Sequence, residues 1–215
     1  SSGALTIGIE TDFDGCMKLV QDLTEEYQNI YLLNSMNSIR IEGQKAIGIE
    51  LLHQLDWHVP DWFVIPVGNA GNISALGKGL RELYELGVID KIPRIAGIQT
   101  ENASPVYDSF KNNFLELTPI KAKPTKASAI QIGNPVSYTK AARELKYFKG
   151  IVESVSEKEL MDWKAQIDQL GISICPNSSV AVAGAMKLNK NGIITNKDDV
   201  VIILTAHGSK FSNTA

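Results

Sequence analysis

The sequence predicts an α/β fold in which a mostly parallel sheet is flanked by helices. Short β-rich runs alternate with longer amphipathic runs along most of the 215 residues, and this alternation is typical of parallel βα units. The run WFVIPV (62–67) is almost entirely apolar, as expected for a strand that helices cover on both faces.

The first third of the chain is expected to contain three strands and two helices. Residues 4–10 and 30–34 are β-rich and predict strands on either side of a helix at 12–28, whose apolar residues recur at helical spacing. A second helix is expected at 43–55, just before the apolar strand at 62–67.

The later elements have clear end signals. Gly87 and Gly192 are expected to end two helices, and Ser156 with Glu159 has the pattern of a capping box. The remaining assignments are helices at 73–87 and 179–192, strands at 94–99, 151–156 and 200–205, and a loop with little regular structure at 100–135.

Composition and charge restrict the classes of function. Hydrophobic residues make up 44% and charged residues 21%, as in ordinary globular proteins. The net charge of -3 argues against a nucleic-acid or membrane-surface partner, and no apolar run approaches the roughly 20 residues that cross a bilayer. No spacing of histidines, cysteines and carboxylates suggests a metal site.

The motif PVGNAGN (66–72) lies where a strand should lead into a helix. This order directs free N–H groups of the loop and the helix N-terminus towards one point, where the helix dipole favours an anion. Glycine permits positive φ, and asparagine tolerates it. The motif is neither a P-loop nor GxGxxG. Two interpretations stay open, a phosphate-binding loop and a plain strand-to-helix turn.

GNAGN after a buried strand resembles the cofactor-phosphate loop of fold type II pyridoxal-phosphate enzymes, the tryptophan-synthase-β type. Within that fold the chain is similar to the threonine synthases of bacteria and plants. The segment 34–72 carries the resemblance, and IPRIAGIQTENASPVY, KPTKASAIQIGNPVSY, GISICPNSSVAVAGAMKL and VVIILTAHGSKF follow in the family's order. Ala46, Asn177, Ser179 and Ser209 depart from the family pattern.

The resemblance implies a set of binding residues. Those expected to hold the phosphate of pyridoxal 5'-phosphate are Gly68, Asn69, Ala70, Gly71 and Asn72. Thr205 would hydrogen-bond the pyridine nitrogen of the cofactor, and Asn34, Ser35 and Arg40 would bind the phosphate of the small-molecule substrate, O-phospho-L-homoserine. The family also implies a possible homodimer, located in the cytoplasm, or in a plastid if the source is plant-like.

The family holds its cofactor through a Schiff-base lysine in an SFKDR-like motif upstream of the phosphate loop. Upstream of Gly68 the chain has only Lys18 and Lys45, in other contexts, and the similar SFKN around Lys111 follows the loop instead. The catalytic residue therefore stays unknown. We expect a chain truncated at its N-terminus and inactive alone, with the end of the small domain at 1–42 and most of the large cofactor-binding domain at 43–215.

The expected function is that of part of a threonine synthase, which converts O-phospho-L-homoserine and water to L-threonine and phosphate. One alternative is a non-catalytic remnant or paralogue that binds pyridoxal phosphate or a phosphorylated ligand. Another is a serine or threonine dehydratase-like enzyme. Arg40 discriminates against the dehydratases, since they share the glycine loop but lack this arginine.

Overall fold

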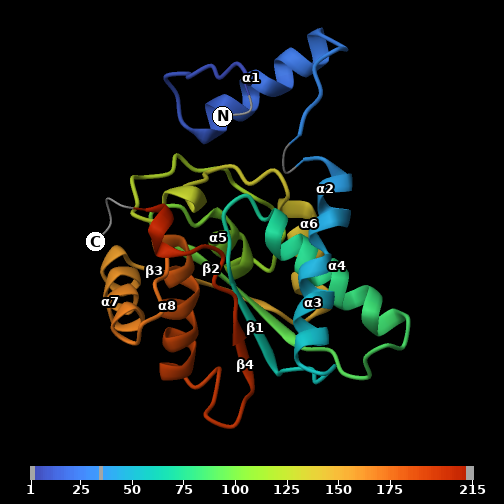
Figure 1. Cartoon of the computed structure of the whole chain (residues 1–215), viewed down its shortest axis with the longest axis vertical. Coiled ribbons are helices and arrows are strands. Elements are labelled where there is room, and N and C mark those ends of the chain that lie inside the picture. The colour runs from blue at the N-terminus through green and yellow to red at the C-terminus, as the bar shows by residue number, and fades with distance from the viewer. Residues whose placement is uncertain (1–2, 34–35, 212–215) are drawn as a thin grey trace.

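The computed structural model describes residues 3–33 and 36–211, and a four-stranded sheet of order β3-β2-β1-β4 lies at its centre (Figure 1). Its strands are β1 (Trp62–Pro66), β2 (Arg94–Thr100), β3 (Ile151–Val155) and β4 (Val200–Ile202). All neighbouring strands pair in parallel, which confirms the predicted α/β fold with a parallel sheet.

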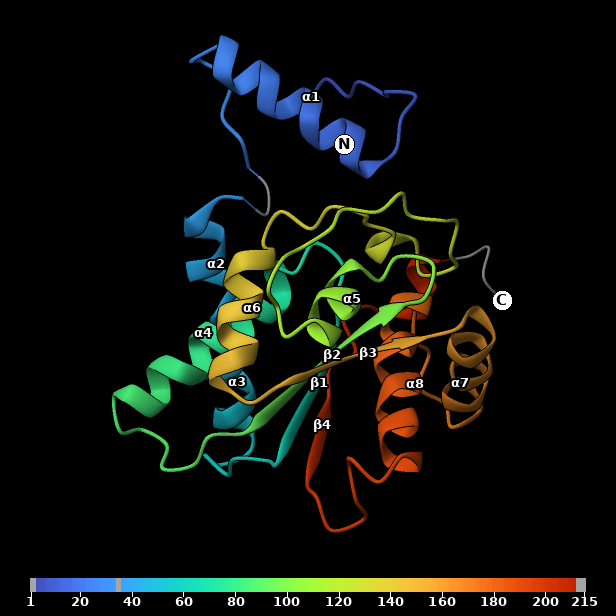
Figure 2. The same ribbon diagram turned by 180° about the vertical axis from the view of Figure 1, so that it is seen from behind.

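Helices cover both faces of this sheet (Figures 1 and 2). One face carries α3, α4 and α6, and the other carries α7 and α8. The described helices are α1 (Phe13–Glu26), α2 (Ser38–Gln44), α3 (Ala46–Gln54), α4 (Gly71–Glu85), α5 (Pro105–Lys111), α6 (Tyr138–Tyr147), α7 (Glu157–Gln169) and α8 (Pro176–Lys190). Within the described residues, no helix is long and apolar enough to cross a membrane.

Alternate residues of β1 point into two separate cores. Phe63 and Ile65 are fully buried against α3, α4 and α6, while Trp62 and Val64 are buried on the side of α7 and α8. This two-sided burial explains why the strand has no polar face. On the second side α8 approaches so closely that a Cβ added at Gly184 would lie 2.5 Å from the side chain of Ile98.

The predicted helix ends are confirmed. The Ser156 side chain accepts the Glu159 amide, and the Glu159 carboxylate accepts the Ser156 amide, so the capping box is complete. Gly87 and Gly192 follow α4 and α8 with φ of +70° and +71°, the left-handed conformation in which glycine avoids a steric penalty.

The two strands predicted at 4–10 and 30–34 were wrong over their described residues. Within the described residues neither segment forms a β-ladder with a neighbouring strand, and Leu5, Ile7 and Leu33 are exposed. A β-rich run becomes a strand only where a neighbouring strand accepts its backbone hydrogen bonds. Local composition cannot report whether such a neighbour exists.

Three further boundaries differ from the prediction. The helix expected at 43–55 is divided, since α2 already starts after the Asn37 cap and α3 begins after Lys45. The expected loop at 100–135 contains α5, which begins with a proline in its first turn. β4 ends at Ile202 rather than at residue 205. The proposed domain division at 42 and 43 falls inside α2 and stays a prediction.

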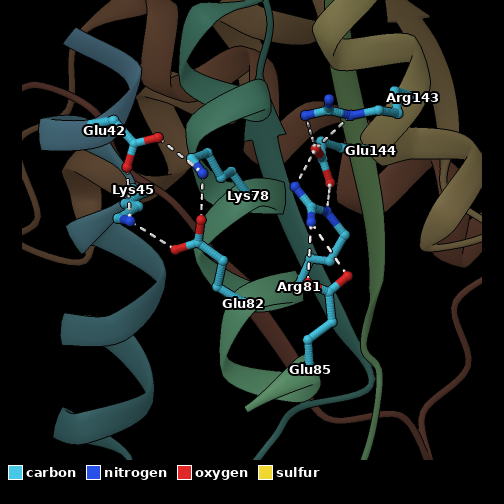
Figure 3. A network of polar contacts seen from close by, with 8 residues as sticks. All are labelled: Glu42, Lys45, Lys78, Arg81, Glu82, Glu85, Arg143 and Glu144. Carbon is cyan, nitrogen blue, oxygen red and sulfur yellow. Dashed lines mark hydrogen bonds and ion pairs between the residues drawn. The ribbon is translucent and has the colours of Figure 1, made fainter. Parts of the chain in front are cut away.

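Two groups of ion pairs attach α4 to its neighbours (Figure 3). On the α2 side, Lys45 Nζ lies 2.8 Å from Glu42 and 2.7 Å from Glu82, and Lys78 bridges the same two carboxylates. A Cβ added at Gly79 would overlap the Lys45 carbonyl oxygen, so the backbones almost touch there. The position of α2 is thus fixed relative to α4.

On the α6 side, the Glu144 carboxylate is fully buried. Arg81 Nε lies 3.1 Å from one oxygen of this carboxylate, and Arg143 Nη2 lies 2.6 Å from the other. A Cβ added at Gly77 of α4 would lie 2.5 Å from the Glu144 Cβ, so a larger residue at 77 would displace the buried carboxylate.

The ion-paired carboxyls of Glu42 and Glu82 should make the stability of the protein depend on pH in the acid range. Hydrogen bonds from Lys45, and then from Lys78, lower the pKa of both carboxyls. Their stabilisation is present above the unfolded-state pKa and is lost as pH falls through the lowered folded-state pKa. We expect the urea midpoint to fall between about pH 5 and pH 2, and to fall less steeply in Glu82→Gln. Glu50→Gln, at an exposed residue of α3, is the control, and equal slopes in both variants would contradict the assignment.

Candidate functional site

The glycine loop connects the end of β1 to the start of α4. Ala70, the residue before the helix, has a φ of +63°. The sequence had suggested that a glycine or an asparagine would take this conformation. A left-handed alanine costs about 1–2 kcal/mol, and such strain persists where the surrounding structure holds the loop in place.

Three residues of the loop hold it in place through close packing and hydrogen bonds. A Cβ added at Gly68 would lie 2.9 Å from Ile130 Cα, so only glycine lets this segment pack on the loop. The Asn72 Nδ2 donates to the Pro66 carbonyl at 2.5 Å, and its Oδ1 accepts the Ile73 amide at 2.8 Å. Asn69 Oδ1 accepts the amide of Val136 at 2.8 Å. The two asparagines therefore hold the loop in its conformation and are also candidate ligands of an anion.

The loop also leaves hydrogen-bond donors without acceptors. Asn69 Nδ2 is buried and has no partner within the described residues. Across the same residues the backbone amides of Ala70, Gly71 and Asn72 donate to no acceptor, and no side chain caps α4. A buried unsatisfied donor costs about 1–3 kcal/mol, so this cluster favours a ligand that supplies several acceptor oxygens.

A cavity of about 310 Å³ lies against this loop. Four loop residues line it, together with Arg40 and Gln44 of α2, which are one helical turn apart. The remaining lining residues come from α1 and from the segment after α5: Phe13, Met17, Ala129, Ile130 and Ile132. The structure therefore brings Arg40 and the glycine loop to one cavity.

Arg40 is exposed and forms no ion pair with another described residue. Its helix is nonetheless held in place by the Glu42–Lys45 contacts to α4. A guanidinium on a fixed helix, facing a cavity with unpaired donors, is suited to a phosphate or carboxylate ligand. Gln44 was not identified from the sequence, although the four-residue spacing from Arg40 could have indicated it.

α1 lines another side of the cavity. Its residues Phe13 and Met17 line the space, and Asp14 Oδ2 accepts the amide of Gly133 at 3.0 Å. A Cβ added at Gly133 would overlap the Ile120 carbonyl oxygen. This glycine thus lets two loop segments pass close together beneath α1.

Thr205 lies beyond the end of β4 and does not line the cavity. Because β4 pairs in parallel with β1, Thr205 and the glycine loop follow the carboxyl ends of neighbouring strands, where ligands of open α/β sheets bind. Thr205 Oγ1 lies 3.4 Å from Ser178 Oγ at the start of α8. Asn34 and Ser35 lie outside the described residues.

Lys111 lies away from the cavity. It ends α5, pairs with Asp108 at 2.9 Å and lies over the ring of Tyr107. The hydrogen bond with Asp108 raises the pKa of Lys111, which is opposite to the lowered pKa that activates a nucleophilic lysine. This supports its interpretation as unrelated to the Schiff-base lysine. No group of metal-ligating side chains forms among the described residues.

Known proteins are similar to this chain in sequence and in fold. The family model of pyridoxal-phosphate dependent enzymes matches residues 1–206. Threonine synthase 2, chloroplastic, of Arabidopsis thaliana is 49% identical over 215 residues, which cover this whole chain and 42% of that protein. Threonine synthase of Methanocaldococcus jannaschii is 41% identical over 214 residues, 99% of this chain and 53% of that protein.

Two solved structures show the same fold at lower identity. Threonine synthase from Escherichia coli superimposes with a TM-score of 0.79 at 19% identity, covering 96% of this chain and 48% of that one. The threonine deaminase of T.th. gives a TM-score of 0.73 at 17% identity, covering 96% of this chain and 63% of that one. The chain spans about half the length of the curated relatives it matches.

Proposed function

Since the chain belongs to the family of pyridoxal-phosphate-dependent enzymes, we propose that it carries the cofactor-phosphate and substrate-phosphate sites of a threonine synthase. Such an enzyme converts O-phospho-L-homoserine and water to L-threonine and phosphate. The identity of 49% and 41% to two threonine synthases supports this assignment. The observation that carries it is the cavity in which Arg40 faces the glycine loop.

The donors of the loop fit the phosphate of the cofactor. Asn69 Nδ2 and the unpaired amides at the start of α4 supply several N–H groups at the positive end of a helix dipole. When bound, pyridoxal phosphate stores the electron pair that remains after a substrate bond to hydrogen is broken. Thr205 would offer the ring nitrogen a neutral hydroxyl, which does not hold a full positive charge there as an aspartate would.

Arg40 is proposed to bind the phosphate of the substrate. Its planar guanidinium can present two parallel N–H groups to one phosphate, and Gln44 offers a further donor on the same side of α2. Phe13 and Met17 line the same cavity with apolar side chains, and a lower local dielectric constant beside such side chains strengthens charge-assisted hydrogen bonds.

The two alternatives, a dehydratase-like enzyme and a non-catalytic relative, can be distinguished from a threonine synthase. Likeness to the threonine deaminase extends only to the fold, and the position of Arg40 in the cavity favours a substrate that carries its own phosphate. A non-catalytic relative would bind the same phosphates without turnover. The homodimer and the compartment, cytoplasm or plastid, stay predictions.

Arg40→Ala should raise the KM for O-phospho-L-homoserine by about ten- to a hundredfold, because a charge-assisted hydrogen bond contributes roughly 1.5–3 kcal/mol. Arg40→Lys should recover only part of this loss, since a lysine cannot present two parallel donors. Steady-state kinetics on the whole protein, with a parallel titration of pyridoxal phosphate, measure both effects, and cofactor affinity should change little.

Lys18→Ala removes a cation of α1 that lies 77% exposed and outside the cavity, and it is the matched control for a general loss of positive charge. An Arg40→Ala enzyme with the KM of the wild type would refute the substrate-phosphate assignment. An equal rise of KM in Lys18→Ala would show that the effect of Arg40→Ala comes from a general loss of positive charge and not from direct binding of the substrate phosphate.

A further inference from the structure

Ser178 connects the start of α8 to the segment after β4. It is fully buried, and its Oγ accepts the Ala206 amide at 3.1 Å. Three possible acceptors surround the same hydroxyl: the Ala206 carbonyl at 3.2 Å, Thr205 Oγ1 at 3.4 Å and Cys175 Sγ at 3.2 Å. Cys175 is the N-cap of α8 and accepts the Ser178 amide. One buried serine thus fixes the backbone of Ala206, directly after Thr205, and lies within hydrogen-bond distance of the Thr205 hydroxyl.

The hydroxyl protons of Ser178 and Thr205 cannot be placed independently. Each hydroxyl has one proton to donate and two lone pairs to accept with. If Thr205 donates its proton outward to a ligand, its oxygen is free to accept, and the Ser178 hydroxyl is the donor within reach. The Ala206 amide in turn donates to Ser178. Such aligned donors polarise one another and strengthen each bond.

We propose that Ser178 is the positioning residue of Thr205: it donates to Thr205 Oγ1 and thereby directs the Thr205 proton towards an unprotonated pyridine nitrogen. This inference rests on the proposed function, because it assumes that Thr205 faces the cofactor ring. Ser178 itself touches no ligand. By directing the Thr205 proton outward, Ser178 favours the unprotonated ring nitrogen, which accepts this hydrogen bond, over the protonated one, which cannot.

Ser179 provides a matched control on the same turn of α8. It is equally buried, but its hydroxyl donates to the Pro176 carbonyl within the helix at 2.8 Å. Ser178→Ala and Ser179→Ala therefore delete the same atom from neighbouring buried positions. Only the first deletion breaks the link to Thr205.

The test measures noncovalent binding to the 215-residue chain by calorimetry. The probes are 4-deoxypyridoxine 5'-phosphate, which has the ring and the phosphate but no aldehyde, and inorganic phosphate. Ser178→Ala should weaken the ring-containing probe about three- to tenfold, the equivalent of one hydrogen bond, and leave inorganic phosphate unchanged. Ser178→Thr, which keeps the hydroxyl, should restore the affinity, and Ser179→Ala should bind both probes as the wild type does.

A second readout follows the ring nitrogen directly. With a ¹⁵N-labelled probe, the nitrogen shift in Ser178→Ala should move towards that of the probe in water. Wild-type affinity and shift in Ser178→Ala would overturn the proposal, as would an equal loss in Ser179→Ala or an equal loss for inorganic phosphate. If Ser178→Ala does not fold, Ser178→Cys takes its place, and its weaker donor should give an intermediate loss; wild-type binding would again contradict the role.

The proposed function fails in a different way. A wild-type chain that binds inorganic phosphate but not 4-deoxypyridoxine 5'-phosphate would contradict the cofactor site itself. The role of Ser178 alone fails when the wild-type chain binds both probes and the variants do not differ.

Discussion

Asn69→Asp is expected to lower the affinity for pyridoxal phosphate by at least about a hundredfold. The change replaces a buried, unpaired donor with a carboxylate in the loop that would hold the phosphate. Two unit charges of the same sign about 4 Å apart repel by roughly 4 kcal/mol at an effective dielectric constant of 20. Titration of pyridoxamine 5'-phosphate, which cannot form a Schiff base, measures the loss without a covalent contribution.

Two control variants separate the causes. Asn69→Ala removes the donor without adding charge, so its loss should be about two- to tenfold, the equivalent of one hydrogen bond. Asn29→Asp adds the same charge at an exposed position in the loop after α1 and should leave the affinity unchanged. If Asn69→Asp binds as tightly as Asn69→Ala, the loop does not face an anion, and the plain-turn interpretation would be correct.

Arg81→Met should lower the free energy of unfolding by about 3 kcal/mol. It keeps most of the apolar stem but leaves the fully buried Glu144 carboxylate with Arg143 alone. Breaking a buried ion pair from one side costs about 3–5 kcal/mol, and the remaining Arg143 contact places the expected loss at the lower end. Urea denaturation followed by circular dichroism provides the measurement.

A double variant tests the cause of that loss. Arg81→Met combined with Glu144→Leu removes both charges, so most of the stability should return, since apolar replacements of a buried pair are often neutral. Glu85→Ala removes only the exposed partner of Arg81 and should change stability by less than about 1 kcal/mol. A double variant as unstable as Arg81→Met would show that packing around Gly77, rather than the unpaired carboxylate, causes the loss.

Local sequence patterns predicted the elements whose signals are local. The strand at 62–67, the helix after it and the Ser156 capping box follow from alternation, apolar runs and capping chemistry. The strands at 4–10 and 30–34 failed because a strand depends on a partner that no local pattern reveals. Ala70 took the left-handed conformation because the packing of the loop imposes it, against the intrinsic preference of alanine.

The candidate site was only partly predictable. The strand–loop–helix order indicated an anion site before any family was considered, but it did not show which distant side chains would face that site. The role of Arg40 came from the resemblance, and its place in the cavity follows from the attachment of α2 to α4. The contact between Ser178 and Thr205 joins segments far apart in sequence, and no sequence spacing predicts it.

The position of β4 at the sheet edge has a consequence for synthesis on the ribosome. β4 joins β1 only after the long segment between them has been made: Asp199, just before β4, donates its amide to Asp61, 138 residues earlier. The glycine loop emerges from the ribosome long before Thr205, and chains fold from the N-terminus as they emerge. A nascent chain that stops before β4 therefore has the glycine loop at the end of β1 but lacks the neighbouring strand β4. The proposed ring-binding residue Thr205 is added only after the loop and β1 have been available for folding for more than 130 residues of synthesis.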